Sequence, residues 1–303
     1  MEVPASSYTK GSMEAAAGPR WAWCGEGIVA LSVARVPIED RGLQFGESVY
    51  EVIAVVGGEP FRLPDPVDRM ISGARAVGID SGVPDLSKWK TIIAQLYRRE
   101  PHRAAVLYAQ LTGGTAPRRH LPPQRHPPFF FAYLCQYAFP VPAEIARGIA
   151  AVTVPDNRWQ HRDIKTTMLL PAVLAKKAAA SAGAEEAIFV GQDGYVNEGA
   201  SSTVFAVRDR VVMTPPVTQR VLPGVSTKAV HALCEQLGIQ TAYCPLTLSD
   251  LHHLDELFIA STTSLLMPVV RIDGNPIGSG TPGSVTLQLA YHFQRHFWGQ
   301  AGP

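Results

Sequence analysis

A single lysine, Lys165, stands between a polar, aromatic stretch that begins at Arg158 and a predicted helix start that Thr166 and Thr167 can cap. A lysine that is desolvated or lies beside another cation has a lowered pKa, and its amine can form a Schiff base with an aldehyde or ketone. Most lysines are solvated, so the segment also fits an ordinary surface lysine before a helix. The spacing alone leaves both interpretations open.

A carboxylate, Glu198, lies further along the chain among small hydroxyl residues, in the segment Tyr195 to Phe205. This composition predicts the mouth of a strand, where the carboxylate is either the charged tip of a turn or the partner of a bound group. A carboxylate in such a place can keep a pyridinium nitrogen protonated, which a cofactor that acts as an electron sink requires from its enzyme.

A third segment, Val221 to Thr227, ends in Gly-Val-Ser-Thr and leads into an amphipathic pattern. The backbone N–H groups of the first helical turn and the hydroxyls of Ser226 and Thr227 converge there. Such a place favours a phosphate group. A plain capped helix is the alternative, because this short motif is common.

A folded scaffold must position these segments. The chain has 303 residues, of which 46% are hydrophobic and 17% charged, and this length and composition are typical of a globular protein with two lobes. Period-2 runs rich in β-branched residues predict strands, and apolar residues at helical spacing predict helices. The expected strands are 27–34, 48–56, 104–111, 129–133, 150–154, 187–190, 204–207, 257–260 and 269–272, and the expected helices are 66–79, 86–97, 169–182, 227–237 and 282–297.

The order of these elements divides the chain. Residues 137–145 contain two prolines and no periodicity, which is typical of a linker. We therefore expect a flexible N-terminal extension (1–20), a small N-terminal domain (21–136), this linker and a larger C-terminal domain (146–303). Residues 187–190 and 204–207 are expected to form a hairpin, and the polar loop 113–128 is long enough to suggest a function.

Composition also limits the partners. A net charge of +1 argues against a nucleic-acid partner, and no apolar run reaches the length of a membrane span. The first twenty residues lack the apolar core of a secretory signal. Four cysteines occur singly, without a CxxC pair, which indicates neither a metal site nor a disulfide framework. We expect a cytoplasmic protein with reduced thiols that acts on small molecules.

The three chemical segments and their neighbours resemble the fold-type IV pyridoxal-phosphate enzymes, and among them the D-amino acid aminotransferases. The resemblance runs from about Trp21 to Phe297. It rests on six ordered blocks, which are 39–52, 66–70, 162–165, 197–202, 222–226 and 255–264. It implies an α+β or α/β fold of two domains, the small N-terminal one α/β and the larger C-terminal one mixed and barrel-like.

The resemblance also implies roles for single residues around pyridoxal 5'-phosphate. Lys165 would bind the cofactor as a Schiff base and move the substrate proton, and Glu198 would pair with the pyridine nitrogen. Leu222 would pack against the ring. The phosphate would be bound by Arg69, Val225, Ser226 and Thr262.

The subfamily depends on where the substrate carboxylate binds. The loop that contains Arg118 and His120 resembles the Arg-x-His element that, with a tyrosine matching Tyr50, binds the substrate carboxylate in D-amino acid aminotransferases. In that family the loop comes from the neighbouring subunit, so the resemblance implies a homodimer. A solvated basic loop is the other interpretation of Arg118 and His120.

We therefore expect transamination from a donor such as D-alanine to a 2-oxo acid such as 2-oxoglutarate, giving pyruvate and D-glutamate. Three enzymes of the same fold remain alternatives: a branched-chain L-aminotransferase, an (R)-amine transaminase and an aminodeoxychorismate lyase. A non-catalytic cofactor-binding protein is a fourth. The size of donor accepted depends on how Val52, Gln110 and Met168 pack.

Overall fold

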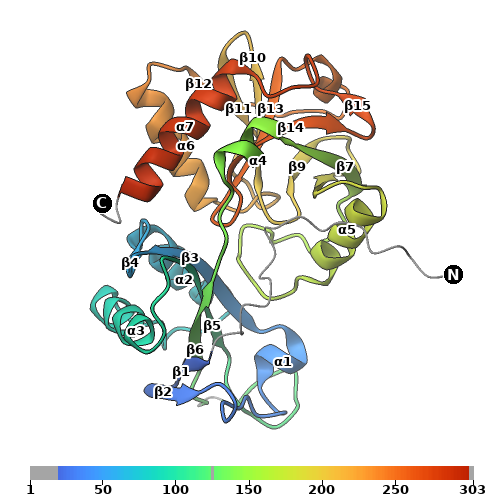
Figure 1. Cartoon of the computed structure of the whole chain (residues 1–303). Coiled ribbons are helices and arrows are strands. Elements are labelled where there is room, and N and C mark those ends of the chain that lie inside the picture. The colour runs from blue at the N-terminus through green and yellow to red at the C-terminus, as the bar shows by residue number, and fades with distance from the viewer. Residues whose placement is uncertain (1–19, 124–125, 300–303) are drawn as a thin grey trace, which may run out of the picture.

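The structure, a computed structural model, describes residues 20–123 and 126–299, which form two β-sheets flanked by helices (Figure 1). The predicted extension 1–20 lies outside the described residues except for Arg20. The first sheet and its helices comprise β1 (Trp21–Cys24), β2 (Gly27–Ala30), α1 (Arg41–Phe45), β3 (Ser48–Val56), β4 (Glu59–Pro60), α2 (Pro64–Ala76), α3 (Leu86–Arg99), β5 (Ala104–Thr112) and β6 (Phe129–Gln136).

The remaining elements belong to the second sheet and its helices. They are α4 (Pro142–Arg147), β7 (Ile149–Pro155), α5 (Leu170–Ser181), β8 (Glu186–Val190), β9 (Val196–Gly199), β10 (Thr203–Arg208), β11 (Val211–Thr214), α6 (Val225–Gln236), β12 (Thr241–Tyr243), the short 3-10 helix η1 (Asp250–His253), β13 (Glu256–Ser261), β14 (Leu265–Ile272), β15 (Asn275–Pro276) and α7 (Ser284–Gly299).

The first sheet is antiparallel throughout, in the order β2-β1-β6-β5-β3-β4. One face is apolar and is covered by α2 and α3. Trp89 of α3, fully buried, meets the ring of Phe130 edge to face at 5.4 Å between centroids. Helix α3 begins here because the side chain of Asp85 accepts the N–H of Lys88 at 2.8 Å.

The opposite face of the first sheet carries the residues of chemical interest. Successive side chains of a strand point to opposite faces, so Ser48, Tyr50 and Val52 of β3 lie away from α2 and α3. Antiparallel pairing places Gln110 beside Tyr50 and Tyr108 beside Val52. We call this surface the site face of the first sheet.

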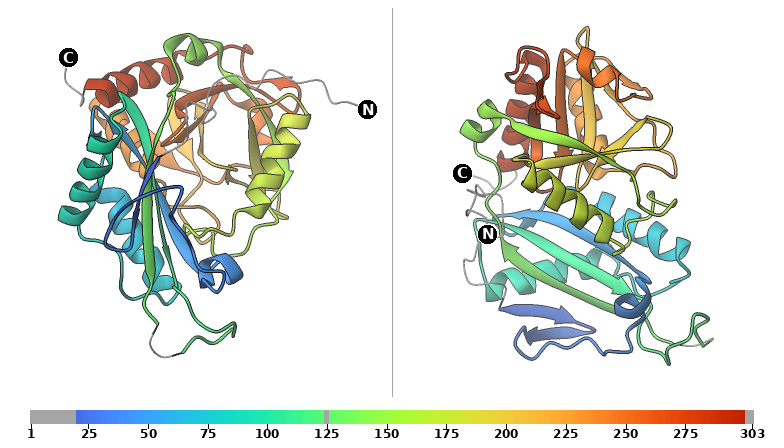
Figure 2. Two further views of the ribbon diagram at one scale, coloured as in Figure 1. Left: turned by 60° about the horizontal axis from the view of Figure 1, so that its bottom comes forward. Right: turned by 90° about the vertical axis from the view of Figure 1, so that its right-hand side faces the viewer.

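The second sheet is mixed and follows the order β12-β11-β10-β13-β14-β7-β8-β9, with β15 at the edge of β14. The β7–β8, β7–β14 and β11–β12 pairs are parallel, and the sheet curls (Figure 2). Helices α4, α6 and α7 pack on one side of it. Helix α5 covers the opposite side of β7 and β8, where Ala175 and Ala179 contact Phe189 and Ala187.

An apolar cluster joins the two halves of the chain. Ala54 and Val106 from the first sheet pack with Leu265 of β14 and with Phe293 and Phe297 of α7. The chain itself crosses between the sheets once, after β6. Four residues of the predicted linker, 142–145, belong to α4. The domain boundaries stay predictions, but no strand pairs across the two sheets within the described residues.

The structure confirms the predicted fold class and most of the predicted elements, with one wrong pairing. The hairpin that begins with β8 returns through β9, not through residues 204–207. Those residues lie in β10, which pairs with β11 and β13 instead. The reason is the turn at Gly199 to Ser202, where the N–H of Gly199 donates to the carbonyl of Ser202 at 2.8 Å and reverses the chain again.

Two further observations concern disulfides and membrane-spanning helices. All four cysteines lie in the described ranges, and none of them forms a disulfide. Within these ranges, no helix has both the length and the hydropathy that crossing a membrane would require.

Candidate active site

A cavity of about 210 Å³ lies where the site face of the first sheet meets the second sheet. Tyr50 and Val52 line it from β3 and Arg69 from α2, and the second half of the chain supplies the loops 158–169, 198–203, 222–226 and 260–263. A more open hollow of about 1160 Å³ shares Arg158 and Arg162 with it. That hollow is lined by neither Lys165 nor Glu198, so the smaller cavity is the candidate site.

Lys165 lies in this cavity, on the loop between β7 and α5. The loop is attached to β3 by backbone hydrogen bonds: the N–H of Tyr50 donates to the carbonyl of Lys165 at 3.0 Å, and the N–H of Thr167 donates to that of Ser48 at 3.3 Å. The Lys165 Nζ is 3.4 Å from the Tyr50 hydroxyl and 4.4 Å from the centre of the Tyr50 ring. The amine is therefore half-buried beside a hydroxyl, not free in solvent.

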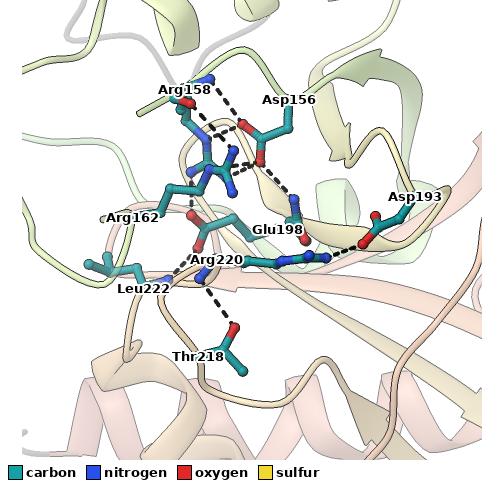
Figure 3. A network of polar contacts seen from close by, with 9 residues as sticks. Asp156, Arg158, Arg162, Asp193, Glu198, Thr218, Arg220 and Leu222 are labelled. Carbon is teal, nitrogen blue, oxygen red and sulfur yellow. Dashed lines mark hydrogen bonds and ion pairs between the residues drawn. The ribbon is translucent and has the colours of Figure 1, made fainter. Parts of the chain in front are cut away.

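Glu198 lines the same cavity from β9 and is 6% exposed. One of its oxygens accepts a hydrogen bond from Arg158, and the other accepts the N–H of Leu222 at 3.0 Å (Figure 3). Burial raises the pKa of Glu198, although the neighbouring Arg158 and the Leu222 N–H counteract part of that rise. A buried carboxylate with an arginine partner can bind a cationic ring nitrogen without being exposed to water.

The carboxylate of Asp156 contacts the guanidinium groups of Arg158 and Arg162, next to Glu198. It accepts hydrogen bonds from Arg158 Nε and Nη2 at 2.9 and 2.8 Å, lies 3.2 Å from Arg162 Nε, and accepts the Asn197 amide at 2.8 Å (Figure 3). Burial alone would raise the pKa of Asp156, but Arg158, together with the Asn197 amide and the charge of Arg162, outweighs it and lowers the pKa. Asp156 therefore stays charged and fixes the guanidinium that pairs with Glu198.

The start of α6 forms the other end of the cavity. Its N-cap residue is Gly224, whose neighbours leave no room for a side chain: an added Cβ would lie 2.7 Å from the Thr203 hydroxyl. No side chain caps the helix, so the N–H groups of Val225 and Ser226 keep no partner within it. Free N–H groups at a helix start form a site for an anion such as phosphate.

Arg69 of α2 supplies a cation at the same end. Its guanidinium donates two hydrogen bonds to Glu51, each 2.7 Å long, and one to the carbonyl of Pro223 at 3.0 Å. Burial would lower the pKa of Arg69, but the fully buried carboxylate of Glu51 raises it. Arg69 is thus held against the segment that leads into α6, with N–H groups left over for a ligand.

Leu222 and Thr262 complete the set of predicted cofactor residues. Leu222 lines the cavity next to Glu198, and Thr262 lies in the turn after β13. In that turn the Ser261 hydroxyl accepts the N–H groups of Thr263 and Ser264 at 3.3 and 3.0 Å. Eight predicted residues therefore border one cavity: Tyr50, Arg69, Lys165, Glu198, Leu222, Val225, Ser226 and Thr262.

Arg118 and His120 do not border this cavity. Both are exposed on the loop between β5 and β6, which extends away from the body of the first sheet (Figure 2). Their side chains contact the ring of Phe45, at 5.3 Å for the Arg118 guanidinium and 5.5 Å between the rings of His120 and Phe45. Within one chain the predicted carboxylate site is therefore represented by Tyr50 alone.

Glu51, Asp156 and Arg158 are among the residues of this site that were not predicted. Glu51 is a charged side chain on the apolar face of β3. A charge in such a position is unusual, and this could have identified Glu51 from the sequence. Asp156 and Arg158 stand two residues apart after β7, but nothing near them in the sequence shows that Arg158 pairs with Glu198.

The model of the family described as "Amino-transferase class IV" matches residues 48–272. The chain is similar to the D-alanine aminotransferase of Bacillus licheniformis, with 39% identity over 270 residues that cover 86% of this chain and 92% of that protein. It is also similar to the D-alanine aminotransferase of Staphylococcus haemolyticus, with 34% identity over 87% of this chain and 93% of that one.

Solved structures show a similar fold. A branched-chain amino acid aminotransferase of T.th., determined with pyridoxamine 5'-phosphate, superposes with a TM-score of 0.84 at 25% identity, covering 93% of this chain and 95% of that one. The branched-chain amino acid aminotransferase of Escherichia coli has a TM-score of 0.83 at 24% identity, covering 93% and 94% of the two chains.

Proposed function

The chain belongs to the class IV aminotransferases, and on this premise we propose that it transfers the amino group of a D-amino acid such as D-alanine to a 2-oxo acid. With 2-oxoglutarate as acceptor, the products are pyruvate and D-glutamate. The D-alanine aminotransferases of Bacillus licheniformis and Staphylococcus haemolyticus, at 39% and 34% identity, support this donor. The observation that carries the proposal is that Lys165, Glu198 and the start of α6 border one cavity.

Pyridoxal 5'-phosphate is the cofactor, and the donor set of the cavity fits it. When bound, it supplies an aldehyde that forms a Schiff base with amines and a ring that delocalises the electron pair of a carbanion. Arg69, Thr262 and the N–H groups at the start of α6 would bind the phosphate. Glu198 would bind the ring nitrogen, and Leu222 would pack against the ring.

Lys165 is the proposed catalytic base. Its Nζ lies 3.4 Å from the Tyr50 hydroxyl, so the amine has a defined position between the site face and the loops of the second sheet. In the neutral form, Nζ would take the proton from the Cα of the substrate and later return a proton. Tyr50, on the same side, would orient the substrate through its carboxylate.

The rest of the carboxylate site is proposed to come from a second copy of the chain. Arg118 and His120 lie outside the cavity of their own chain, and the exposed guanidinium of Arg118 makes no ion pair with any other described residue. A homodimer in which this loop reaches the partner's cavity would use both side chains. A cytoplasmic location agrees with four unpaired cysteines, because thiols stay reduced there.

An assay of amino donors tests the proposal. The purified enzyme is incubated with 2-oxoglutarate and either D-alanine, L-leucine, L-valine or (R)-1-phenylethylamine, and the enantiomers of glutamate are separated by chiral chromatography. We expect D-alanine to be preferred and D-glutamate to accumulate. A preference for L-leucine or L-valine would instead favour the branched-chain enzyme, and a preference for (R)-1-phenylethylamine would favour the amine transaminase. Repeated pyruvate release from aminodeoxychorismate without any 2-oxo acid would favour the lyase.

A further inference from the structure

Arg41, the first residue of α1, is an arginine with a 2% exposed side chain, a degree of burial that arginines reach only with partners. It lies outside the cavity and has no role in the cofactor site. Its only carboxylate partner among the described residues is Glu47, at 2.7 Å from Nε and 2.6 Å from Nη2. Glu47 therefore accounts for only part of the guanidinium's hydrogen-bonding capacity.

The remaining N–H groups of Arg41 bind the backbone of the loop that carries Arg118 and His120. Nη1 donates to the carbonyl of Arg119 at 2.7 Å, and Nη2 donates to the carbonyl of His120 at 3.0 Å. These residues are separated from Arg41 by 78 and 79 positions. One rigid guanidinium therefore fixes two consecutive carbonyls of an otherwise exposed loop, which its planar arrangement of donors allows.

The base of this loop is fixed by the neighbours of Arg41. Asp40, fully buried, accepts the Thr112 hydroxyl at 2.6 Å, and that hydroxyl accepts the N–H of Gly114 at 3.0 Å. The N–H of Arg41 donates to the carbonyl of Gly114 at 2.9 Å. The loop thus has two anchors on α1, one at its start and one at Arg119 and His120.

The end of α1 organises the side chains of the loop. The ring of Phe45 lies 4.8 Å from the Arg41 guanidinium and 5.3 Å from that of Arg118, and its centroid is 5.5 Å from the His120 ring. Arg41 holds the backbone while Phe45 contacts both side chains. The loop is therefore presented in one arrangement before any partner or substrate binds.

We propose that Arg41 is a positioning residue for substrate binding: it fixes the backbone of Arg119 and His120 so that Arg118 and His120 reach the carboxylate of a substrate in a second copy. This rests on the proposed function, because it takes the Arg118 and His120 side chains as carboxylate ligands. Arg41 itself does not contact the substrate. Its contribution is to limit the positions that the loop can adopt.

The test is a double-mutant cycle with Arg41→Met and Arg118→Ala, read as KM and kcat for D-alanine. Displacing a ligand by about 1 Å can cost on the order of a hundredfold in rate or binding. We expect Arg41→Met to raise KM at least about tenfold and to change kcat less than about threefold. In the Arg118→Ala background the same change should have almost no further effect on KM, because the residue that Arg41 positions is already gone.

Two further variants separate positioning from folding. Arg41→Lys keeps a cation beside Glu47 but cannot span both carbonyls, so it should raise KM while keeping more of the thermal stability than Arg41→Met. Arg35→Met is the matched control. Arg35 also donates to two carbonyls, those of Ser32 and Ala34 at 2.9 and 2.7 Å, but on an exposed segment that does not carry the loop. Its KM should equal that of the wild type.

The outcomes are distinct. A wild-type KM in Arg41→Lys, or fully additive effects of Arg41→Met and Arg118→Ala, would overturn the positioning role while leaving the transaminase activity intact. A wild-type enzyme that does not use D-amino acids contradicts the proposed function itself. An increase in KM for Arg41→Met that disappears in the Arg118→Ala background supports the inference.

Discussion

Replacing Glu198 by glutamine is expected to slow proton removal from the substrate Cα far more than it weakens binding of the cofactor. The carboxylate accepts hydrogen bonds from Arg158 and from the Leu222 N–H, and a glutamine amide can accept only one of the two. Losing one hydrogen bond to a charged group costs about 1.5–3 kcal/mol of folding free energy. Arg158 stays paired with Asp156 at 2.9 and 2.8 Å, so no buried charge is left alone.

A kinetic effect is expected because the charge of Glu198 is needed as the reaction proceeds. A preorganised charge that stabilises a transition state is worth on the order of 10²- to 10³-fold in rate. Glu198→Gln should therefore slow the half-reaction with D-alanine by at least about a hundredfold. Stopped-flow absorbance of the cofactor measures this rate in a single turnover, and equilibrium dialysis measures the affinity for the cofactor.

Glu185→Gln is the control, because Glu185 is an exposed carboxylate on the same part of the chain and does not line the cavity. Its half-reaction rate should match that of the wild type. If Glu198→Gln also reacts at the wild-type rate, the assignment of Glu198 to the ring nitrogen is wrong. If it loses the cofactor before any rate can be measured, Glu198 acts mainly in binding and the expected order of the two effects is wrong.

Three other changes test the remaining parts of the site. Lys165→Ala should abolish covalent retention of the cofactor after borohydride reduction, measured by mass spectrometry, and a retained adduct at another lysine would refute the role of Lys165. Arg118→Ala should raise KM for D-alanine about ten- to a hundredfold, since a charge-assisted contact is worth about 1.5–3 kcal/mol; unaltered kinetics would contradict the carboxylate site. The folded-state pKa of Asp156 lies below its unfolded value of about 3.9, so its stabilisation is complete above that pH and is lost as the pH falls through the folded pKa. Asp156→Asn should therefore lower the urea midpoint of unfolding at pH 7 and make that midpoint fall less steeply as the pH is lowered from about 5 to 3. A midpoint that falls as steeply as in the wild type would show that other groups cause the loss of stability in acid.

Local signals in the sequence indicated three parts of the cavity, and the resemblance to the fold-type IV enzymes decided between the alternatives that each signal left open. A lysine before a helix, a carboxylate at a strand mouth and a glycine before an amphipathic helix each depend on a few neighbouring residues. The structure brings Lys165, Glu198 and Val225 around one cavity. What periodicity cannot show is which side chains meet across the fold. Arg158 pairs with Glu198 across 40 positions, and Arg69 donates to Pro223 across 154 positions.

Errors in the predicted elements have the same origin. Strand β1 was missed because Trp21–Cys24 is only a four-residue segment, and it becomes a strand by pairing with β2 on one side and β6 on the other. The wrong hairpin at residues 187–207 came from treating β9 and the turn after it as one loop, since Val-Asn-Glu-Gly has little strand propensity of its own. In both cases tertiary pairing decides the conformation.

The loop of Lys165 belongs to the second half of the chain but is hydrogen-bonded to the first half. Its backbone adds to the end of β3 through Tyr50 and Ser48, and Val49 forms an isolated bridge with Thr166. If the two sheets rock against each other, the amine and the tyrosine hydroxyl therefore travel together as one unit. The base thus keeps its spacing from the residue that orients its substrate, whichever half of the chain moves.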